Sequence, residues 1–189
     1  MVKLVAFLGN PGIKYAKTRH NIAWLLTEEG GYIDSLSWQK KFNGYYAVND
    51  YNGEKVYFLK PSTYMNRSGS SIQALASFYK ITQEEILVVH DEIEIDFGVI
   101  SFKRNGGLAG HNGLRSTAES LGTRDFLRFR LGISRPDHPD ISSYVLNKFT
   151  PEENEQLPRF LQKADAALEL CLKNGFESVE TEFRKVKVI

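Results

Sequence analysis

The sequence predicts an α/β fold: a single-domain sandwich in which helices cover both faces of a twisted mixed sheet with parallel central strands. Two short runs, Leu4–Leu8 and Ile86–Val89, are apolar at every position, which is typical of strands buried on both faces. Segments with helical spacing of apolar residues alternate with strands, and Asn52-Gly53 indicates one antiparallel hairpin. This order of elements favours a mixed sheet with helices packed on it.

Length and composition fit one domain over residues 1–189. The apolar fraction of 42% and the charged fraction of 25% are close to globular averages, which excludes a disordered or fibrous protein. No apolar run reaches the roughly 18 residues that cross a bilayer, and the N-terminus lacks a signal-peptide pattern. The single cysteine, Cys171, excludes an internal disulfide. We therefore expect a cytoplasmic protein without a membrane partner.

The first strand is followed by a turn and a helix. The apolar run stops at Gly9-Asn10-Pro11-Gly12, a segment rich in turn residues. Thr18 can cap a helix from about His20 to Glu29, which Gly30-Gly31 would end.

A hairpin, a helix and a second buried strand follow. Tyr45–Tyr51 and Glu54–Leu59 flank the Asn-Gly pair and predict the two hairpin strands. Apolar residues between Ile72 and Tyr79 recur at helical spacing. The run at Ile86–Val89 predicts a strand that ends at His90-Asp91-Glu92.

The remaining third of the chain predicts two more strands and two helices. Strands are expected at Val99–Lys103 and Phe126–Ile133, with a helix over Leu114–Leu121 between them. Residues 135–150 carry two prolines and suit a lid-like loop. Residues 151–173 have the acidic start and apolar period of a C-terminal helix.

Polar residues that follow the two buried strands suggest a general base. Ligands of open α/β sheets bind beyond the carboxyl ends of the strands. If these ends converge, the Asp91 carboxylate can fix the tautomer of His20 and stabilise its imidazolium. His90 is a weaker candidate, because neighbouring strand residues point to opposite faces. Alternatively, His20 is an exposed residue near a helix start and Asp91 caps a turn.

Water is the nucleophile that remains for such a base. There is no G-x-S-x-G motif, and Cys171 lies in an apolar helical pattern. The sequence also lacks H-E-x-x-H, and its four histidines lack ligand spacing, so we expect neither a metal site nor a cofactor.

Three asparagines stand at predicted strand ends or helix entrances: Asn10, Asn66 and Asn112. Each side-chain amide can donate and accept a hydrogen bond, so it can bind a peptide backbone or support a developing oxyanion. The alternative is ordinary turn chemistry, in which asparagine is common.

Charge is distributed unevenly, although the net charge is only +1. Residues 84–96 contain six acidic and no basic residues, whereas residues 103–135 contain seven basic and two acidic ones. Lys103 and Arg130 fall on separate predicted strands and can form a small phosphate clamp; the alternative is a solvated face. The segment Gly106–Gly113 matches neither a P-loop nor G-x-G-x-x-G.

Five motifs, in order along nearly the whole chain, resemble bacterial-type peptidyl-tRNA hydrolase. They are LGNPGIKYAKTRHN, KPSTYMNRSG, ILVVHDEIEIDFGVISFK, GGLAGHNGL and RFRLGISRP. The resemblance implies a monomeric, metal-independent esterase. Its substrate and partner would be peptidyl-tRNA, cleaved between the C-terminus of the peptide and the 3′ ribose so that tRNAs dropped by ribosomes are recycled.

The resemblance also implies a role for each matching residue. His20 would be the catalytic base, Asp91 the residue that orients it, and Asn10 the residue that holds the tRNA end or the water. The other implied roles are peptide and water binding by Asn66 and Asn112, lining of the cleft by Met65 and Tyr15, support by His111, and a clamp for the 5′-phosphate region of tRNA by Lys103 and Arg130. Ala23-Trp24 and Leu108-Ala109 depart from the usual family pattern.

Two other functions are compatible with the residues alone. The first is a non-catalytic RNA- or nucleotide-binding module that uses the glycine-rich loop and its basic neighbours. The second is a nucleoside phosphorylase-like enzyme.

Overall fold

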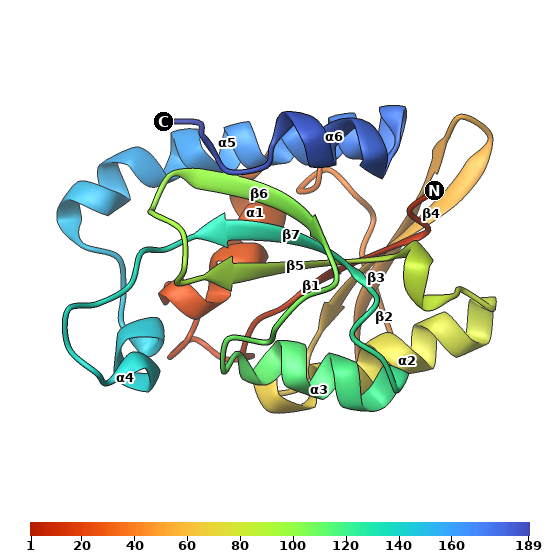
Figure 1. The fold of residues 1–189 in the computed structure, drawn as a ribbon. Coiled ribbons are helices and arrows are strands. Elements are labelled where there is room, and N and C mark those ends of the chain that lie inside the picture. The colour runs from red at the N-terminus through yellow and green to blue at the C-terminus, as the bar shows by residue number, and fades with distance from the viewer.

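The computed structural model describes residues 1–189, and its centre is one eight-stranded mixed sheet. The strand order is β2-β3-β4-β1-β5-β7-β6-β8 (Figure 1). The strands are β1 (Leu4–Phe7), β2 (Gln39–Lys41), β3 (Gly44–Tyr51), β4 (Glu54–Pro61), β5 (Ile86–Glu92), β6 (Val99–Arg104), β7 (Leu127–Gly132) and β8 (Val186–Lys187).

The helices connect and flank these strands. They are α1 (Ile22–Glu29), α2 (Ser68–Tyr79), α3 (Asn112–Leu121), α4 (Ile141–Leu146), α5 (Pro151–Asn174) and α6 (Phe176–Glu182), with the 3-10 helices η1 (Arg19–Asn21), η2 (Met65–Arg67) and η3 (Gln83–Glu85). None of the helices has the length and apolar composition required to span a bilayer.

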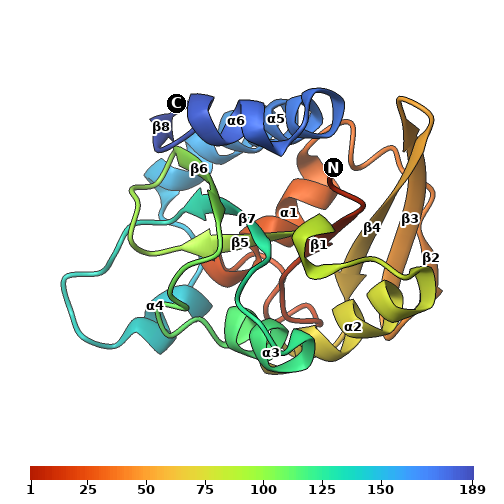
Figure 2. The same ribbon diagram turned by 45° about the vertical axis from the view of Figure 1, so that its right-hand side comes forward.

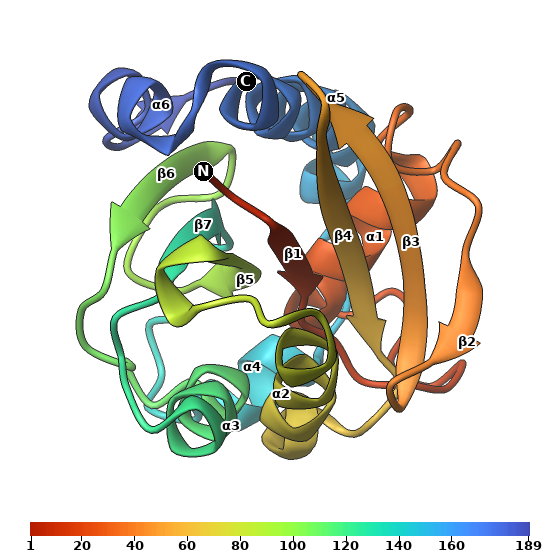
Figure 3. The same cartoon turned by 90° about the vertical axis from the view of Figure 1, so that its right-hand side faces the viewer.

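The four central strands are parallel and the outer ones are antiparallel. β1 pairs in parallel with β4 and β5, and β5 pairs in parallel with β7. β3 runs antiparallel to β4, and β6 runs antiparallel to β7. The predicted fold class is confirmed. Helices α5 and α6 lie above the sheet in Figure 3, and α2 and α3 lie below it.

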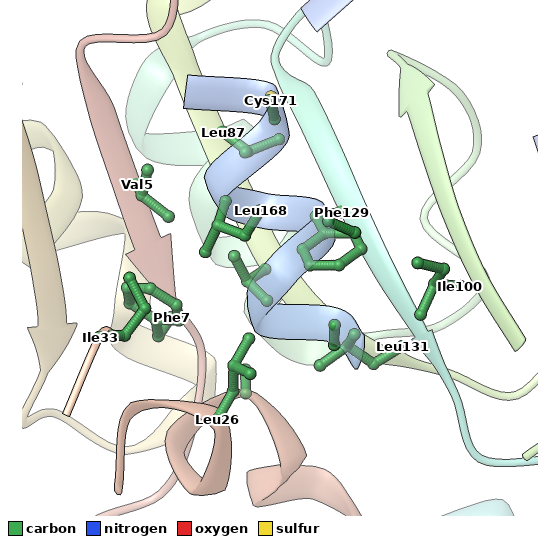
Figure 4. Close-up of a cluster of buried hydrophobic side chains, with 14 of the residues drawn as sticks. Val5, Phe7, Leu26, Ile33, Leu87, Ile100, Phe129, Leu131, Leu168 and Cys171 are labelled. Carbon is green, nitrogen blue, oxygen red and sulfur yellow. The ribbon is translucent and has the colours of Figure 1, made fainter. Parts of the chain in front are cut away.

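Alternate residues of the central strands pack into two hydrophobic layers, one on each face of the sheet. Val5 and Phe7 of β1 pack with Leu87 of β5 in the larger layer, where α5 contributes Leu168 (Figure 4). The intervening residues of β1, such as Ala6, belong to the smaller layer under α2 and α3. Because side chains alternate across a strand, an apolar run without alternation supplies both layers at once.

The structure differs from the predicted elements in three respects. Thr18 does not cap a helix with its side chain: its Oγ1 donates to Tyr15 O at 2.9 Å, and the chain first forms η1 before α1 begins at Ile22. Residues 135–150, expected as a loop, contain α4. The short strands β2 and β8 and the helix α6 were not predicted (Figure 2).

Candidate active site

The predicted site residues gather where the central parallel strands end. In Figure 1 the arrowheads of β5 and β7 point to the side of the molecule on which α4 lies. Asn10 follows β1, and Asp91 is the second-last residue of β5. The convergence expected from the sequence therefore brings these strand ends to one place.

Asp91 is buried between two imidazoles. His20 Nδ1 lies 2.9 Å from both Asp91 carboxylate oxygens, and His111 Nε2 lies 2.8 Å from Oδ1. Although burial opposes the charged form, His20 and His111 together lower the pKa of Asp91 well below its ordinary value. The carboxylate is therefore ionised and accepts from both rings.

His111 has no nitrogen left for chemistry. Its Nδ1 accepts hydrogen bonds from the backbone N–H groups of Gly113 and Leu114, at 3.1 and 3.3 Å, and thereby caps α3. The proton of the neutral ring must then be on Nε2, which donates to Asp91. His111 is a fixed, neutral donor.

His20 differs from His111 in one respect that matters for catalysis. Its Nδ1 donates to Asp91, whereas its Nε2 makes no hydrogen bond in the structure. The ring lines an open cleft, although only 7% of the residue surface is exposed. The neutral ring thus presents an unprotonated nitrogen to the cleft.

His90 takes no part in this pair of hydrogen bonds. Its Nδ1 donates to the main-chain oxygen of Asp91 at 2.7 Å. Burial lowers the pKa of His90 well below its ordinary value, so the ring stays neutral.

Asn10 is held with only its amide nitrogen free. Its Oδ1 accepts from Met65 N at 2.7 Å. Its backbone N donates to Asn21 Oδ1, and its backbone O accepts from Asn21 Nδ2, each at 2.9 Å. Asn21 is fully buried and was not predicted as a site residue, although it directly follows His20. These bonds join the end of β1 to the turn that carries His20.

The cleft in front of His20 has a volume of about 370 Å³. It brings together six of the predicted residues: Asn10, Tyr15, His20, Met65, Asn66 and Asn112. Ser142, Val145 and Leu146 of α4 form a wall that was not predicted. Asp91 and His111 line a smaller cavity of about 70 Å³ that also reaches His20.

Arg19 fastens the wall to the turn that carries His20. Its Nη1 donates to Lys148 O and its Nη2 to Glu153 Oε2, both at 2.7 Å. The guanidinium also lies 4.3 Å from the centre of the Tyr144 ring. Arg19 was not predicted, because nothing local to it identifies partners more than 120 residues away.

Trp24, one of the departures from the family pattern, packs under the turn after β1. Its indole Nε1 donates to Phe7 O at 3.0 Å. A Cβ added to Gly9 would lie only 2.5 Å from the indole ring, so the close packing of Trp24 requires glycine there. Ala23 beside it is fully buried in the larger hydrophobic layer.

Lys103 and Arg130 lie together, but outside this cleft. They line a separate hollow of about 550 Å³ with Arg184 and Lys185. Arg130 Nε also pairs with Glu92 Oε2 at 3.0 Å. The hollow is therefore more basic than a two-residue clamp.

Arg128 supports the glycine-rich loop beside that hollow. Its guanidinium is buried and donates to Gly107 O at 2.6 Å and Gly106 O at 2.8 Å. These bonds hold the chain that leads from β6 to His111.

The two histidines and Asp91 also place one possible metal-ligand atom each within 4.8 Å of one another. Each ring nitrogen that faces Asp91 carries the proton it donates, and a metal ion would have to displace both protons. The observed donors and acceptors satisfy one another as a hydrogen-bonded chain.

The chain is similar in sequence and in structure to known proteins of one family. A family model described as peptidyl-tRNA hydrolase matches residues 4–188. A peptidyl-tRNA hydrolase of Geotalea daltonii is 43% identical over 92% of each chain, and one of Treponema pallidum is 48% identical over 84% of this chain and 81% of its own. The crystal structure of peptidyl-tRNA hydrolase from Acinetobacter baumannii is 33% identical with a TM-score of 0.88, covering 100% of this chain and 97% of that one. This chain therefore belongs to the peptidyl-tRNA hydrolase family.

Proposed function

We infer that this chain hydrolyses peptidyl-tRNA at the ester that joins the C-terminus of the peptide to the 3′ ribose, and so returns tRNA to translation. Family membership supports the reaction. The observation that carries the mechanism is the free Nε2 of His20 on a ring held by the ionised Asp91.

In the proposed reaction, a water oxygen attacks the ester carbonyl while His20 Nε2 takes one proton from that water. The tetrahedral intermediate then expels the ribose oxygen, which receives the proton from His20. The products are a tRNA with a free hydroxyl and a peptide carboxylic acid, which loses the second proton of the water to solvent and becomes the carboxylate. Asp91 stabilises the imidazolium between these steps, and general-base catalysis of this kind contributes about 10²- to 10⁴-fold.

The amide groups of the cleft are assigned to positioning. Asn10 Nδ2 is the only hydrogen-bonding group of that side chain without a partner in the protein, which supports a contact to water or the ribose end. Asn66 and Asn112 are exposed in the same cleft and suit the peptide backbone. An aminoacyl-tRNA without a peptide bond cannot make these hydrogen bonds, each of which is worth about 0.5 to 1.5 kcal/mol.

The basic hollow is assigned to the tRNA backbone. Lys103 and Arg130 would contact phosphates there, as expected from the sequence, and Arg184 and Lys185 would add to them. From membership of the family we also propose that the enzyme acts as a monomer in the cytosol.

The test compares His20→Gln with His138→Gln as a matched control, since His138 is exposed and lies outside both cavities. His20→Gln should lower kcat for release of an N-acetylated amino acid from tRNA by about 10³-fold and leave tRNA binding unchanged. His138→Gln should behave as the wild type. Wild-type turnover by His20→Gln would refute the base assignment, and binding without turnover by the wild type would favour the non-catalytic RNA-binding module.

A further inference from the structure

A second hollow continues the catalytic cleft on the side of Asn66. Its volume is about 750 Å³, and it lies between the β2–β3 turn, the chain after β4, the start of α2, and the middle and end of α3. Tyr64 and Asn66 line both the cleft and this hollow. A chain that occupies the cleft can therefore extend directly into the hollow, which we call the side groove.

The side groove is positively charged. Lys40 and Arg67 are its only charged lining residues, both are exposed, and neither side chain makes a hydrogen bond or an ion pair. The other polar lining residues are neutral: Asn43, Ser62, Thr63, Tyr64, Asn66, Ser70, Ser116 and Ser120. Two unpaired cations without a carboxylate favour an anionic occupant.

The walls of the side groove are fixed by backbone hydrogen bonds. Asn43 O accepts from Ser62 N at 2.9 Å and from Ser62 Oγ at 3.0 Å, which joins the β2–β3 turn to the chain after β4. Gly69 N donates to Ser116 Oγ at 3.0 Å, which joins α2 to α3. Thr63 Oγ1 is buried and has no partner. The groove is thus preformed, and one wall hydroxyl remains unsatisfied.

We propose that the side groove binds the peptide residues that precede the esterified one, and that Lys40 and Arg67 make the enzyme prefer acidic side chains there. This inference rests on the proposed function, which assigns Asn66 to the peptide backbone. The groove continues from Asn66, whereas the basic hollow assigned to tRNA shares no lining residue with it. The peptide, rather than the tRNA, therefore reaches Lys40 and Arg67.

The experiment measures kcat/KM for N-acetyl tripeptidyl-tRNAs that share one tRNA and one C-terminal residue. The two preceding residues are both Glu, both Ser or both Lys, and N-acetyl-aminoacyl-tRNA serves as the substrate too short to reach the groove. The wild type should prefer the Glu peptide over the Lys peptide by about fivefold, as expected for exposed ion pairs. Arg67→Glu and Lys40→Glu should each abolish this preference, because the new carboxylate offsets the remaining cation, and each should leave the short substrate unchanged.

Arg159→Glu is the matched control, because Arg159 is an exposed cation on α5, outside the groove, and carries the same charge change. It should keep the wild-type preference. Equal kcat/KM for the three tripeptides in the wild type would overturn the proposal. An equal loss for all substrates in Arg67→Glu, together with weaker inhibition by free tRNA, would overturn it in favour of a tRNA contact.

The outcome for His20 is independent of this one. If His20→Gln retains turnover while the charge preference persists in the wild type, the base assignment fails and the groove assignment stands. If His20→Gln is inactive and the preference is absent, only the groove assignment fails.

Discussion

Two buried carboxyl groups of this protein have opposite electrostatic character. Asp91 at the end of β5 is 2% exposed, and Asp165 in the middle of α5 is 6% exposed. Two imidazoles outweigh burial and lower the pKa of Asp91, whereas burial raises the pKa of Asp165 to about 6. Asp165 Oδ2 accepts from Tyr32 N at 2.9 Å, and its Oδ1 has no partner.

The difference shows that burial alone does not prepare a carboxylate for catalysis. Both groups lose hydration, but only Asp91 has two ring N–H donors directed at it. Asp165 receives a backbone donor, lines neither cavity of the active site, and lies on the helix that covers the larger hydrophobic layer. The number of hydrogen-bond donors therefore separates a reactive carboxylate from a structural one.

Asp91→Asn should have the largest effect on turnover. An amide offers one acceptor and one N–H donor group where two imidazole donors require acceptors, so one ring must change its tautomer. Turnover should fall by about 10²-fold or more, with little change in tRNA affinity. Single-turnover kinetics provide the measurement, and Asp165→Asn, expected to have nearly wild-type turnover, is the control. Similar losses in both variants would remove the distinction between the two carboxyls.

His111 variants sharpen the comparison by separating its two hydrogen-bonding roles. His111→Ala loses both the cap of α3 and the bond to Asp91, whereas His111→Asn keeps a capping side chain too short to repeat both contacts. Alanine should cost about 1 kcal/mol of unfolding free energy more than asparagine. Turnover should fall about tenfold in both, because the bond to the charged Asp91 is lost in each.

Urea titrations give the unfolding free energies for this pair, and steady-state assays give the turnover. If asparagine restores turnover along with stability, His111 acts only as a cap and the second donor to Asp91 is irrelevant to catalysis.

Asp165→Asn should have the smallest effect and should change stability rather than activity. A carboxyl whose pKa is raised to about 6 stabilises the fold below the pKa of the unfolded chain, and this contribution is lost as the pH rises through about 6. The unfolding free energy of the asparagine variant, relative to that of the wild type, should therefore be higher at pH 7.5 than at pH 4.5. Chemical denaturation at both pH values measures this gain. A gain that is the same at both would show that Asp165 does not titrate in this range.

The sequence predicts those parts of the fold that have a strong local pattern. The runs at Leu4–Leu8 and Ile86–Val89 are apolar at every position because both faces of those strands are covered. Strand β2 has three exposed residues and β8 has two residues, so neither has a hydrophobic pattern to find. Helix α4 is short and follows two prolines, which favours a loop when only local signals are considered.

The sequence likewise predicts only those site residues whose position follows from the local pattern. The sequence predicts that His20 and Asp91 meet, because His20 lies in the segment after β1, Asp91 lies at the end of β5, and the ends of these strands converge. It does not predict that His111 reaches the same carboxylate, because that contact depends on how α3 approaches β5. Arg19 and Asn21 were missed for the same reason: their partners are brought close only by the complete fold.

The 3-10 helix η1 explains how three consecutive residues serve three different parts of the molecule. Such a helix has about three residues per turn, so successive side chains point about 120° apart. Arg19 binds the chain between α4 and α5, His20 binds Asp91 on β5, and Asn21 binds the backbone after β1. Deleting or inserting one residue in this turn would send every one of the three side chains toward the wrong neighbour. The turn therefore does not tolerate changes in length, and its three residues act as one structural unit.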